Sequence, residues 1–168
     1  IKEAVENIRL SRSLEIDVDQ IDITDPATYK LYSDGRTIGT FQFESAGMKR
    51  VLTQLRPESI EDIIAVISLY RPGPMESIPR YIENRHHPER VTYRHPLLKP
   101  ILQVTYGCIV YQEQVMEICR KLAGYSYGRA DLVRRAMAKK KADVMAQERE
   151  YFIYGKKRED GTVEVPGA

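Results

Sequence analysis

Apolar side chains recur every three or four residues along most of the chain, which is the spacing of amphipathic helices. This pattern indicates a mostly α fold, multi-helical, with a few short strands. The stripes predict a helix at the first residues, others at 26–33, after Ser45, from about 57 to 69, at 75–84, at 96–102 and before Gly124, and two more at about 128–138 and 141–154.

Capping residues and turn residues mark several of these boundaries. Asp25 followed by Pro26 is typical of a helix start, because Asp can cap the free N–H groups and proline suits the first turn. Ser45 stands at a second start. Gly124 stands where the next long stripe ends. The helix at 57–69 is apolar on most sides, which predicts a position in the core.

Three short segments have strand character. Thr40-Phe41-Gln42-Phe43 alternates between polar and apolar residues, as a short strand does. Ile109-Val110-Tyr111 is strand-like or extended and leads into a helix. Thr162-Val163-Glu164-Val165 is a β-prone stub after a polar turn. Together with a start inside a helical stripe, this end suggests a piece excised from a longer protein.

Composition and charge narrow the class of protein. A hydrophobic fraction of 42% with 30% charged residues is typical of a soluble globular protein. No apolar run approaches the roughly 20 residues that span a bilayer, and no signal peptide is present. Cys108 and Cys119 have no disulfide or zinc spacing, which favours a cytosolic protein with reduced thiols. Residues 1–62 carry 8 basic and 12 acidic side chains, whereas residues 63–168 carry 18 basic and 12 acidic ones. The basic excess of the second part predicts a polyanionic partner.

The most basic stretch lies at 129–141, with six cations and one acid in thirteen positions. Arg134 and Arg135 are suited to phosphate, because a guanidinium presents a fork of donors to two oxygens. On one continuous helix Arg134 and Lys141 would share a face, and Asp131 would pair with Arg135 at i+4. The alternative is a solvated helix face, which is what most charge runs are.

Two junctions could place a side chain at a site. Tyr111 stands where an apolar extended stretch becomes a helix, so its ring could contact a ligand or could pack at the helix start. Arg71 follows a core helix and precedes Pro72-Gly73-Pro74, which fix a sharp turn. That turn could simply end the helix or could hold Arg71 against an anion.

Other candidate chemistry is weaker. His86, His87 and His95 lie in a polar stretch with three arginines and no acidic or Cys complement, so a metal site is not favoured there. Asp17, Asp19 and Asp22 are better explained as a solvated linker. The chain has no Ser-His-Asp arrangement, no HExxH motif and no phosphate loop of the GxxxxGK[ST] kind.

Four motifs resemble the alpha subunit of bacterial DNA polymerase III, a family C replicative polymerase. They are Phe-Gln-Phe-Glu-Ser at 41–45 with Gly-Met at 47–48, Leu-Tyr-Arg-Pro-Gly-Pro at 69–74, the segment 106–115, and the segment 130–141 with its arginine pair and lysine run. They occur in the order and spacing of the family and span about residues 38 to 150. Four long motifs in order are far more specific than one.

The resemblance implies the fingers region, just after the last catalytic aspartate of the palm. It suggests a connector at 1–37, the helical fingers region at 38–158 and the start of a truncated turn and strand at 159–168. No segment resembles the palm motifs whose carboxylates hold two Mg²⁺ ions in this family. The intact parent is therefore expected to be a Mg²⁺-dependent DNA-directed DNA polymerase in the cytoplasm, and the isolated fragment is expected to be inactive.

The resemblance also assigns roles to residues by position. Arg134 and Arg135 match the pair that contacts the triphosphate of the incoming nucleotide (dNTP), and Tyr111 matches the tyrosine beside that nucleotide. Lesser candidates for phosphate or DNA contact are Arg71, Arg129, Lys139, Lys140 and Lys141. The implied partners are dNTP, primer-template DNA, the rest of the alpha subunit and the replisome with its sliding clamp, and no membrane.

Two other classes of function are compatible with the residues alone. One is a non-enzymatic helical module that binds the nucleic-acid backbone. The other is a structural domain whose basic face meets an acidic protein. Steep salt dependence would indicate backbone binding, because each neutralised phosphate releases counterions.

Overall fold

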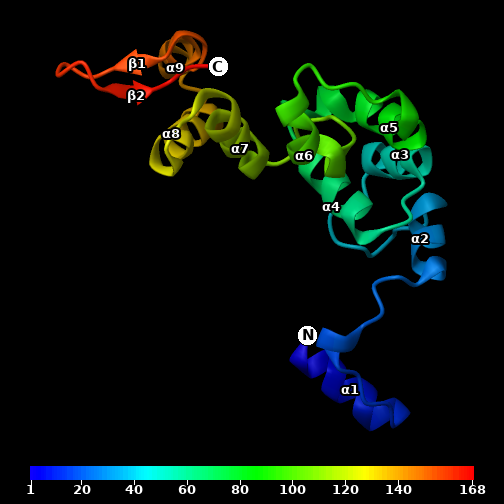
Figure 1. The fold of residues 1–168 in the computed structure, drawn as a ribbon. Helices are drawn as coiled ribbons and strands as arrows, with labels where there is room; N and C mark the ends of the chain where they lie inside the picture. Colours follow the sequence, from blue (N-terminus) through cyan, green and yellow to red (C-terminus); the bar gives the residue numbers. More distant parts are fainter. The chain divides into compact units, whose positions relative to one another are not determined.

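A computed structural model describes all 168 residues and contains nine α-helices, five short 3₁₀ helices and one two-stranded sheet (Figure 1). The prediction of a mostly α fold is confirmed. The α-helices are α1 (Lys2–Arg12), α2 (Pro26–Ser33), α3 (Ala46–Leu55), α4 (Ile60–Leu69), α5 (Ile78–His86), α6 (Lys99–Leu102), α7 (Gln112–Ala123), α8 (Tyr127–Ala138) and α9 (Ala142–Tyr154). The 3₁₀ helices are Val18–Gln20, Pro74–Ser77, Pro88–Arg90, Pro96–Leu98 and Gln103–Thr105, and the strands are β1 (Lys156–Lys157) and β2 (Val163–Val165).

The chain forms two compact units, Ile1–Ile63 and Ile64–Ala168. The division coincides with the change of charge along the sequence, because the acidic excess lies in the first unit and the basic excess in the second. No helix is both long enough and apolar enough to cross a membrane.

In the first unit, local capping sets where helices begin. The Asp25 side chain accepts hydrogen bonds from the N–H groups of Ala27 (3.2 Å) and Thr28 (2.9 Å), which fixes the start of α2 as predicted. Ser45 caps α3 by accepting from the N–H of Met48 at 3.2 Å. The buried apolar side chains of this unit are Tyr29, Phe43, Met48, Leu52, Leu55 and Ile63. Each fully buried Leu contributes roughly 1.5–3 kcal/mol to stability.

The strand predicted at 40–43 is wrong, because the chain there forms consecutive turns. The N–H of Thr40 donates to the carbonyl of Thr37, and that of Phe43 donates to the carbonyl of Thr40. Gln42 adopts a left-handed φ of 69°, which a strand cannot contain. The turns still bury Phe43 and expose Phe41, so they reproduce the alternation without a β ladder.

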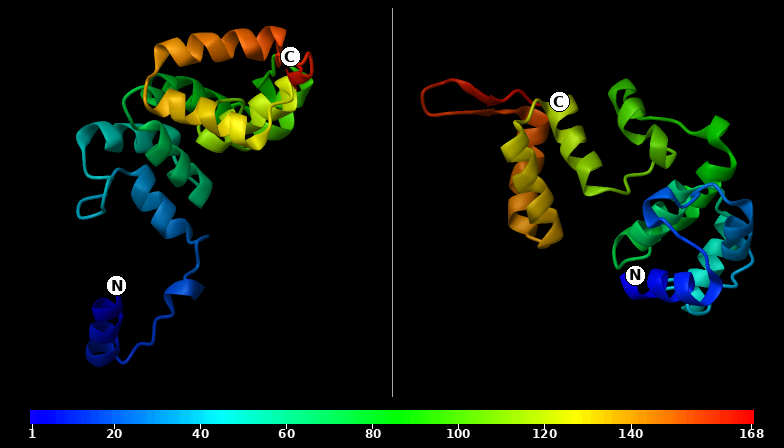
Figure 2. Two further views of the ribbon diagram at one scale, coloured as in Figure 1. Left: turned by 90° about the vertical axis from the view of Figure 1, so that its left-hand side faces the viewer. Right: turned by 90° about the horizontal axis from the view of Figure 1, so that it is seen from below.

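In the second unit, helices α7, α8 and α9 enclose one apolar cluster. Helix α8 packs against both α7 and α9, and both views of Figure 2 show α9 running alongside α8. The buried residues of the cluster are Met116, Cys119, Ala123, Tyr125, Ala130, Val133 and Val165. Val165 belongs to β2, so the short hairpin contributes to the same core.

Gly124 ends α7 as the sequence predicted, and the end of the chain packs closely against it. Its φ of 69° is left-handed, and a Cβ at this position would lie 2.7 Å from Pro166 Cγ. The N–H of Gly167 donates to the carbonyl of Ala123 at 3.3 Å. Strand β2 pairs antiparallel with β1, a partner that the sequence did not indicate.

Candidate functional site

Four of the predicted site residues line one cavity of about 670 Å³ in the second unit, the Tyr111 cavity. Arg71 reaches it from the turn after α4, Tyr111 from the segment before α7, and Arg134 and Lys140 from the end of α8 and the turn that follows. The other lining residues are Ser68, Pro72, Gly73, Pro74, Ile109, Val110, Gln112, Glu113, Val115, Met137 and Ala138. Segments that are far apart in the sequence therefore form one concave surface with three cations.

The turn that carries Arg71 depends on its glycine. Gly73 has a φ of 106°, which an L side chain rarely adopts, although the space around it is open. The N–H of Arg71 donates to the carbonyl of Leu69 at 2.7 Å, and the carbonyl of Arg71 accepts from Met75 at 3.1 Å. The backbone of Arg71 is thus fixed while its side chain is exposed.

Tyr111 is half-buried and extended, with φ −105° and ψ 147°, at the position directly before α7. Gln114, which is only 6% exposed, holds this segment in place. Its Oε1 accepts from the N–H groups of Val110 and Tyr111, both at 2.9 Å. Its Nε2 donates to Thr105 Oγ1 at 2.8 Å and to the Ile101 carbonyl at 3.2 Å. One buried amide therefore sets the position of the Tyr111 backbone.

Arg134 bridges α8 and the first residue of α7. Its Nε donates to Asp131 Oδ1 at 2.7 Å, and its Nη1 donates to Gln112 Oε1 at 3.0 Å. Asp131 also accepts from Arg135 Nη2 at 2.6 Å through its other oxygen, which is the predicted i+4 pair. The pKa of Asp131 is lowered, chiefly by the hydrogen bond from Arg134. One ionised carboxylate thus orients both arginines.

The two arginines of the pair differ in exposure and in whether they line the cavity. The Arg134 side chain is 31% exposed and lines the Tyr111 cavity, whereas the Arg135 side chain is 62% exposed and is not part of the lining. An Asp131 carboxylate shared by both keeps their guanidinium groups close at one point.

The lysine run does not continue the helix, so the expectation that Arg134 and Lys141 share one helix face is wrong. Helix α8 ends at Ala138, and the next three residues form the turn to α9. Lys140 takes a left-handed φ of 51°, and the N–H of Lys141 donates to the carbonyl of Ala136. Of the three lysines, Lys140 alone lines the Tyr111 cavity.

Arg129 lies in a different environment, where it joins α8 to α9 and β2. Its side chain is 11% exposed, and Nη2 donates to Glu148 Oε1 at 2.8 Å while Nη1 pairs with Glu164. The guanidinium also lies over the rings of Tyr151 (4.9 Å) and Tyr125 (5.5 Å). The structure does not bring Arg129 to the Tyr111 cavity.

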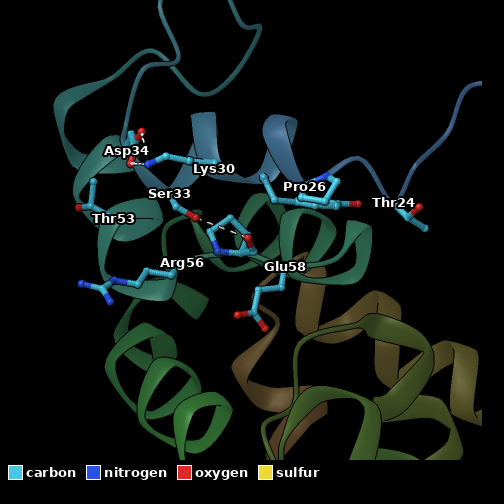
Figure 3. A pocket seen from close by; sticks show the side chains of 10 residues that line it. Thr24, Pro26, Lys30, Ser33, Asp34, Thr53, Arg56 and Glu58 are labelled. Carbon is cyan, nitrogen blue, oxygen red and sulfur yellow. Dashed lines mark hydrogen bonds and ion pairs between the residues drawn. The ribbon is translucent and has the colours of Figure 1, made fainter.

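A further cavity of about 610 Å³ lies in the first unit, between α2 and the end of α3 (Figure 3). Its lysine, Lys30, is paired with Asp34 at 3.0 Å, and Ser33 Oγ donates to the Pro57 carbonyl at 3.5 Å. None of the predicted site residues lines it. We assign no ligand to it.

The residues present do not form a metal centre. No group of three or more His, Cys, Asp or Glu side chains is placed to hold a metal ion. Cys108 and Cys119 are free and buried, and burial raises the pKa of Cys119 to about 11, which keeps the thiol protonated. We therefore derive no reaction step through Mg²⁺ from this chain.

Gln114 positions the Tyr111 segment, and the sequence pattern did not single it out. A Gln three residues after a helix cap is the second half of a capping box, but the first half, a Ser or Thr at the cap, is here replaced by Tyr111. Its contacts with Ile101 and Thr105 join segments nine and more residues apart, and these the local pattern does not contain.

Comparison with known proteins gives a consistent result over nearly the whole chain. Residues 1–160 match the family described as the bacterial DNA polymerase III alpha subunit finger domain. The chain is 49% identical over 158 residues to the DNA polymerase III subunit alpha of Staphylococcus aureus strain COL, covering 94% of the chain and 15% of the relative. It is 50% identical over 157 residues, with the same coverages, to the protein of the same name from Staphylococcus epidermidis strain ATCC 12228. The chain thus spans about 15% of the length of these relatives.

Proposed function

Because the chain belongs to the family of the bacterial DNA polymerase III alpha subunit finger domain, we propose that it forms the part of a replicative DNA polymerase that holds the incoming dNTP. The observation that supports this proposal is the Tyr111 cavity, to which three separate segments bring Arg71, Tyr111, Arg134 and Lys140. The proposed site binds the nucleotide with its triphosphate on the cations and its nucleoside beside Tyr111.

The chemistry of the lining suits a triphosphate. A volume of about 670 Å³ lies within the roughly 300–1,000 Å³ of small-molecule sites. Arg134 supplies a planar fork of donors that Asp131 and Gln112 already orient, so little side-chain freedom is lost on binding. Arg71 and Lys140 also line the cavity and add two further positive charges. Phosphoryl transfer depends on positioning and charge neutralisation, and fixed cations supply both.

The remaining predicted residues take different places in the proposal. Arg135 is exposed and shares Asp131 with Arg134, so we assign it a second triphosphate contact from the open side of α8. Lys139 and Lys141 are assigned to the DNA backbone. Arg129 has its donors on Glu148 and Glu164, and we assign it the role of holding α8 in place.

In the longer protein, this region acts with parts that the chain does not contain. We propose that the Mg²⁺ ligands of the nucleotidyl transfer lie there, together with most primer-template contacts and the attachment to the sliding clamp. The isolated chain is accordingly inactive in primer extension, and the parent works in the cytoplasm in DNA replication.

The test is Arg134→Ala in the full-length alpha subunit. A charge-assisted phosphate contact is worth roughly 1.5–3 kcal/mol, so single-turnover incorporation at limiting dNTP should slow at least about tenfold. Affinity for primer-template should stay unchanged. Arg149→Ala is the matched control, because Arg149 is an exposed arginine on α9 that pairs only with its neighbour Glu150.

Normal incorporation kinetics together with lost primer-template affinity would assign Arg134 to DNA instead of nucleotide. That result would favour the rival reading of the chain as a nucleic-acid-binding module.

A further inference from the structure

A further cavity of about 500 Å³ lies in the second unit, and we name it the Leu97 pocket. One side of it is apolar and is formed by Leu97, Pro100 and Ile101, which belong to the 3₁₀ helix Pro96–Leu98 and to α6. The other side consists of residues of α7. Its volume falls within the roughly 300–1,000 Å³ of small-molecule sites. None of the residues assigned to the nucleotide lines it.

The apolar side of the Leu97 pocket is held in place before any ligand binds. Leu97 is 46% exposed although it is a large apolar residue. Its N–H donates to His95 Nδ1 at 3.2 Å, which fixes the backbone at the start of the 3₁₀ helix. Pro100, the second residue of α6, restricts the backbone there. A preformed site loses little conformational entropy on binding.

The polar side of the pocket carries more negative than positive charge. Glu113, Glu117 and Lys121 line it from successive turns of α7. Glu117 binds Arg120 Nη1 at 2.6 Å, whereas Glu113 takes part in no ion pair. Lys121 lies two turns from Glu113, about 12 Å along the helix axis, so the Glu113 end stays anionic. An apolar wall beside an unpaired carboxylate suits a ligand with an apolar body and one cationic group.

The Leu97 pocket shares a wall with the Tyr111 cavity. Glu113 lines both of them. Gln114 also lines the Leu97 pocket, and its amide donates to the Ile101 carbonyl at 3.2 Å and accepts from the N–H of Tyr111 at 2.9 Å. A ligand that packs on Ile101 and Gln114 therefore contacts the side chain that positions Tyr111.

We propose that the Leu97 pocket binds a small amphipathic cation, and that its occupation strengthens dNTP binding in the Tyr111 cavity. The second part of this inference rests on the proposed nucleotide site. The apolar body of the ligand packs on Leu97 and Ile101, and its ammonium group pairs with Glu113. The pocket wall has this shape only while Gln114 holds the Tyr111 segment, so the ligand favours the arrangement in which the nucleotide site is formed. Coupling of this kind is reciprocal.

The first experiment measures binding to the full-length alpha subunit without nucleotide or DNA, by ligand-observed NMR. The probe is phenethylamine, with phenethyl alcohol as its neutral and hydrocinnamate as its anionic counterpart. We expect a Kd on the order of 1 mM for the amine. The alcohol should bind roughly threefold more weakly, which is the size expected for an exposed ion pair, and the anion more weakly still. Equal affinities for the three probes overturn the assignment of a cation.

Leu97→Ala should weaken binding of phenethylamine at least about fivefold, because it removes much of the apolar wall. Val104→Ala is the matched control, since Val104 is another exposed apolar residue, at 66%, and does not line the pocket. This control should bind the amine as the wild type does. Both variants should extend primers normally without the amine, which shows that they are folded. Unchanged binding by Leu97→Ala, or no binding at millimolar amine, overturns the proposal.

The second experiment measures the coupling as the KM for dNTP in primer extension, with and without saturating phenethylamine. The amine should lower this KM about fivefold in the wild type and in Val104→Ala but not in Leu97→Ala. Tyr111→Ala should still bind the amine, because Tyr111 does not line the pocket, and its KM should no longer respond. A KM that rises or stays constant in the wild type while the amine binds overturns the coupling.

Failure of this inference is distinguishable from failure of the proposed nucleotide site. The binding experiment contains no nucleotide, and Arg134→Ala should leave the affinity for phenethylamine unchanged. Absence of amine binding therefore leaves the nucleotide site standing. Normal nucleotide kinetics in Arg134→Ala would overturn the nucleotide site, and the binding experiment would still decide whether the Leu97 pocket takes a cation.

Discussion

Tyr111 is half-buried at the start of α7 and borders the cavity with an aromatic ring that suits all four bases. We expect Tyr111→Phe to have a mild effect in the full-length subunit. Tyr111→Ala should raise the KM for dNTP or alter discrimination against modified nucleotides, with little loss of stability. Thermal melting and incorporation kinetics on the same variant test this. A core residue would instead cost about 3–5 kcal/mol on truncation, with normal nucleotide affinity in the folded enzyme.

Gln114 sets the backbone of Tyr111, and its two ends have separable roles. Gln114→Leu removes the acceptor for two partly buried N–H groups, so it should lower stability and raise the dNTP KM as Tyr111→Ala does. Gln114→Glu keeps that acceptor and loses the donor to Ile101 and Thr105, so it should lower stability with a smaller effect on KM.

A double-mutant cycle with Tyr111→Ala gives the decisive readout for Gln114. If Gln114 acts through Tyr111, the two effects on KM are not additive. Additive effects on KM would show that Gln114 stabilises the fold and does not act through Tyr111.

At the scale of elements, Arg129 joins α8 to α9 and to β2. Arg129→Ala leaves Glu148 partly buried without its cation, and we expect a loss of about 3–5 kcal/mol. Arg129→Lys should recover only part of it, because an ammonium cannot bridge two carboxylates as a guanidinium fork does. Chemical denaturation measures both variants.

The same cluster predicts a dependence on pH. The pKa of Glu164 is lowered, chiefly by the hydrogen bond from Lys156 and in addition by the charge of Arg129. Its stabilising contribution is therefore present above the usual Glu pKa of about 4.3 and is lost as the pH falls through the lower folded value. The gap in stability between wild type and Arg129→Ala should narrow in acid. A gap that stays constant would show that packing and not charge holds the cluster.

The sequence predicted elements well where a boundary has a local cause. The start of α2 at Asp25, its end at Ser33, the cap at Ser45 and the stop at Gly124 all follow from the residue types within a few positions. It failed at 40–43, where turn hydrogen bonds and the left-handed Gln42 imitate the alternation of a strand. The pairing of β2 with β1 was also not predictable, because two residues of β1 carry no pattern.

At the scale of the whole molecule, the sequence supplied the candidate residues but not their grouping. Arg71, Tyr111, Arg134 and Lys140 share a cavity because α4, α7 and α8 bring three segments together, which is a tertiary effect. Arg129 belongs to the same basic stretch as Arg134 and lies in a separate ion cluster. The helical position of each arginine, not the charge of the stretch, separates them.

Charge is distributed between the two compact units in a way that matters for a polyanionic ligand. The Tyr111 cavity lies in the second unit, which carries 18 of the 26 Lys and Arg residues. The first unit has an excess of acidic residues. The proposed nucleotide site is thus in the unit whose basic excess attracts phosphate.

The central claim, that the incoming dNTP occupies the Tyr111 cavity, is tested most directly by mapping which arginines the nucleotide protects. The full-length subunit with primer-template is treated with a guanidine-specific dicarbonyl reagent, with and without the complementary dNTP, and each site is quantified by mass spectrometry. We predict that the nucleotide protects Arg134, Arg135 and Arg71, while the exposed control Arg149 reacts equally in both samples. Arg134 reacting at the same rate with and without dNTP, in a preparation that extends primers, would contradict the account.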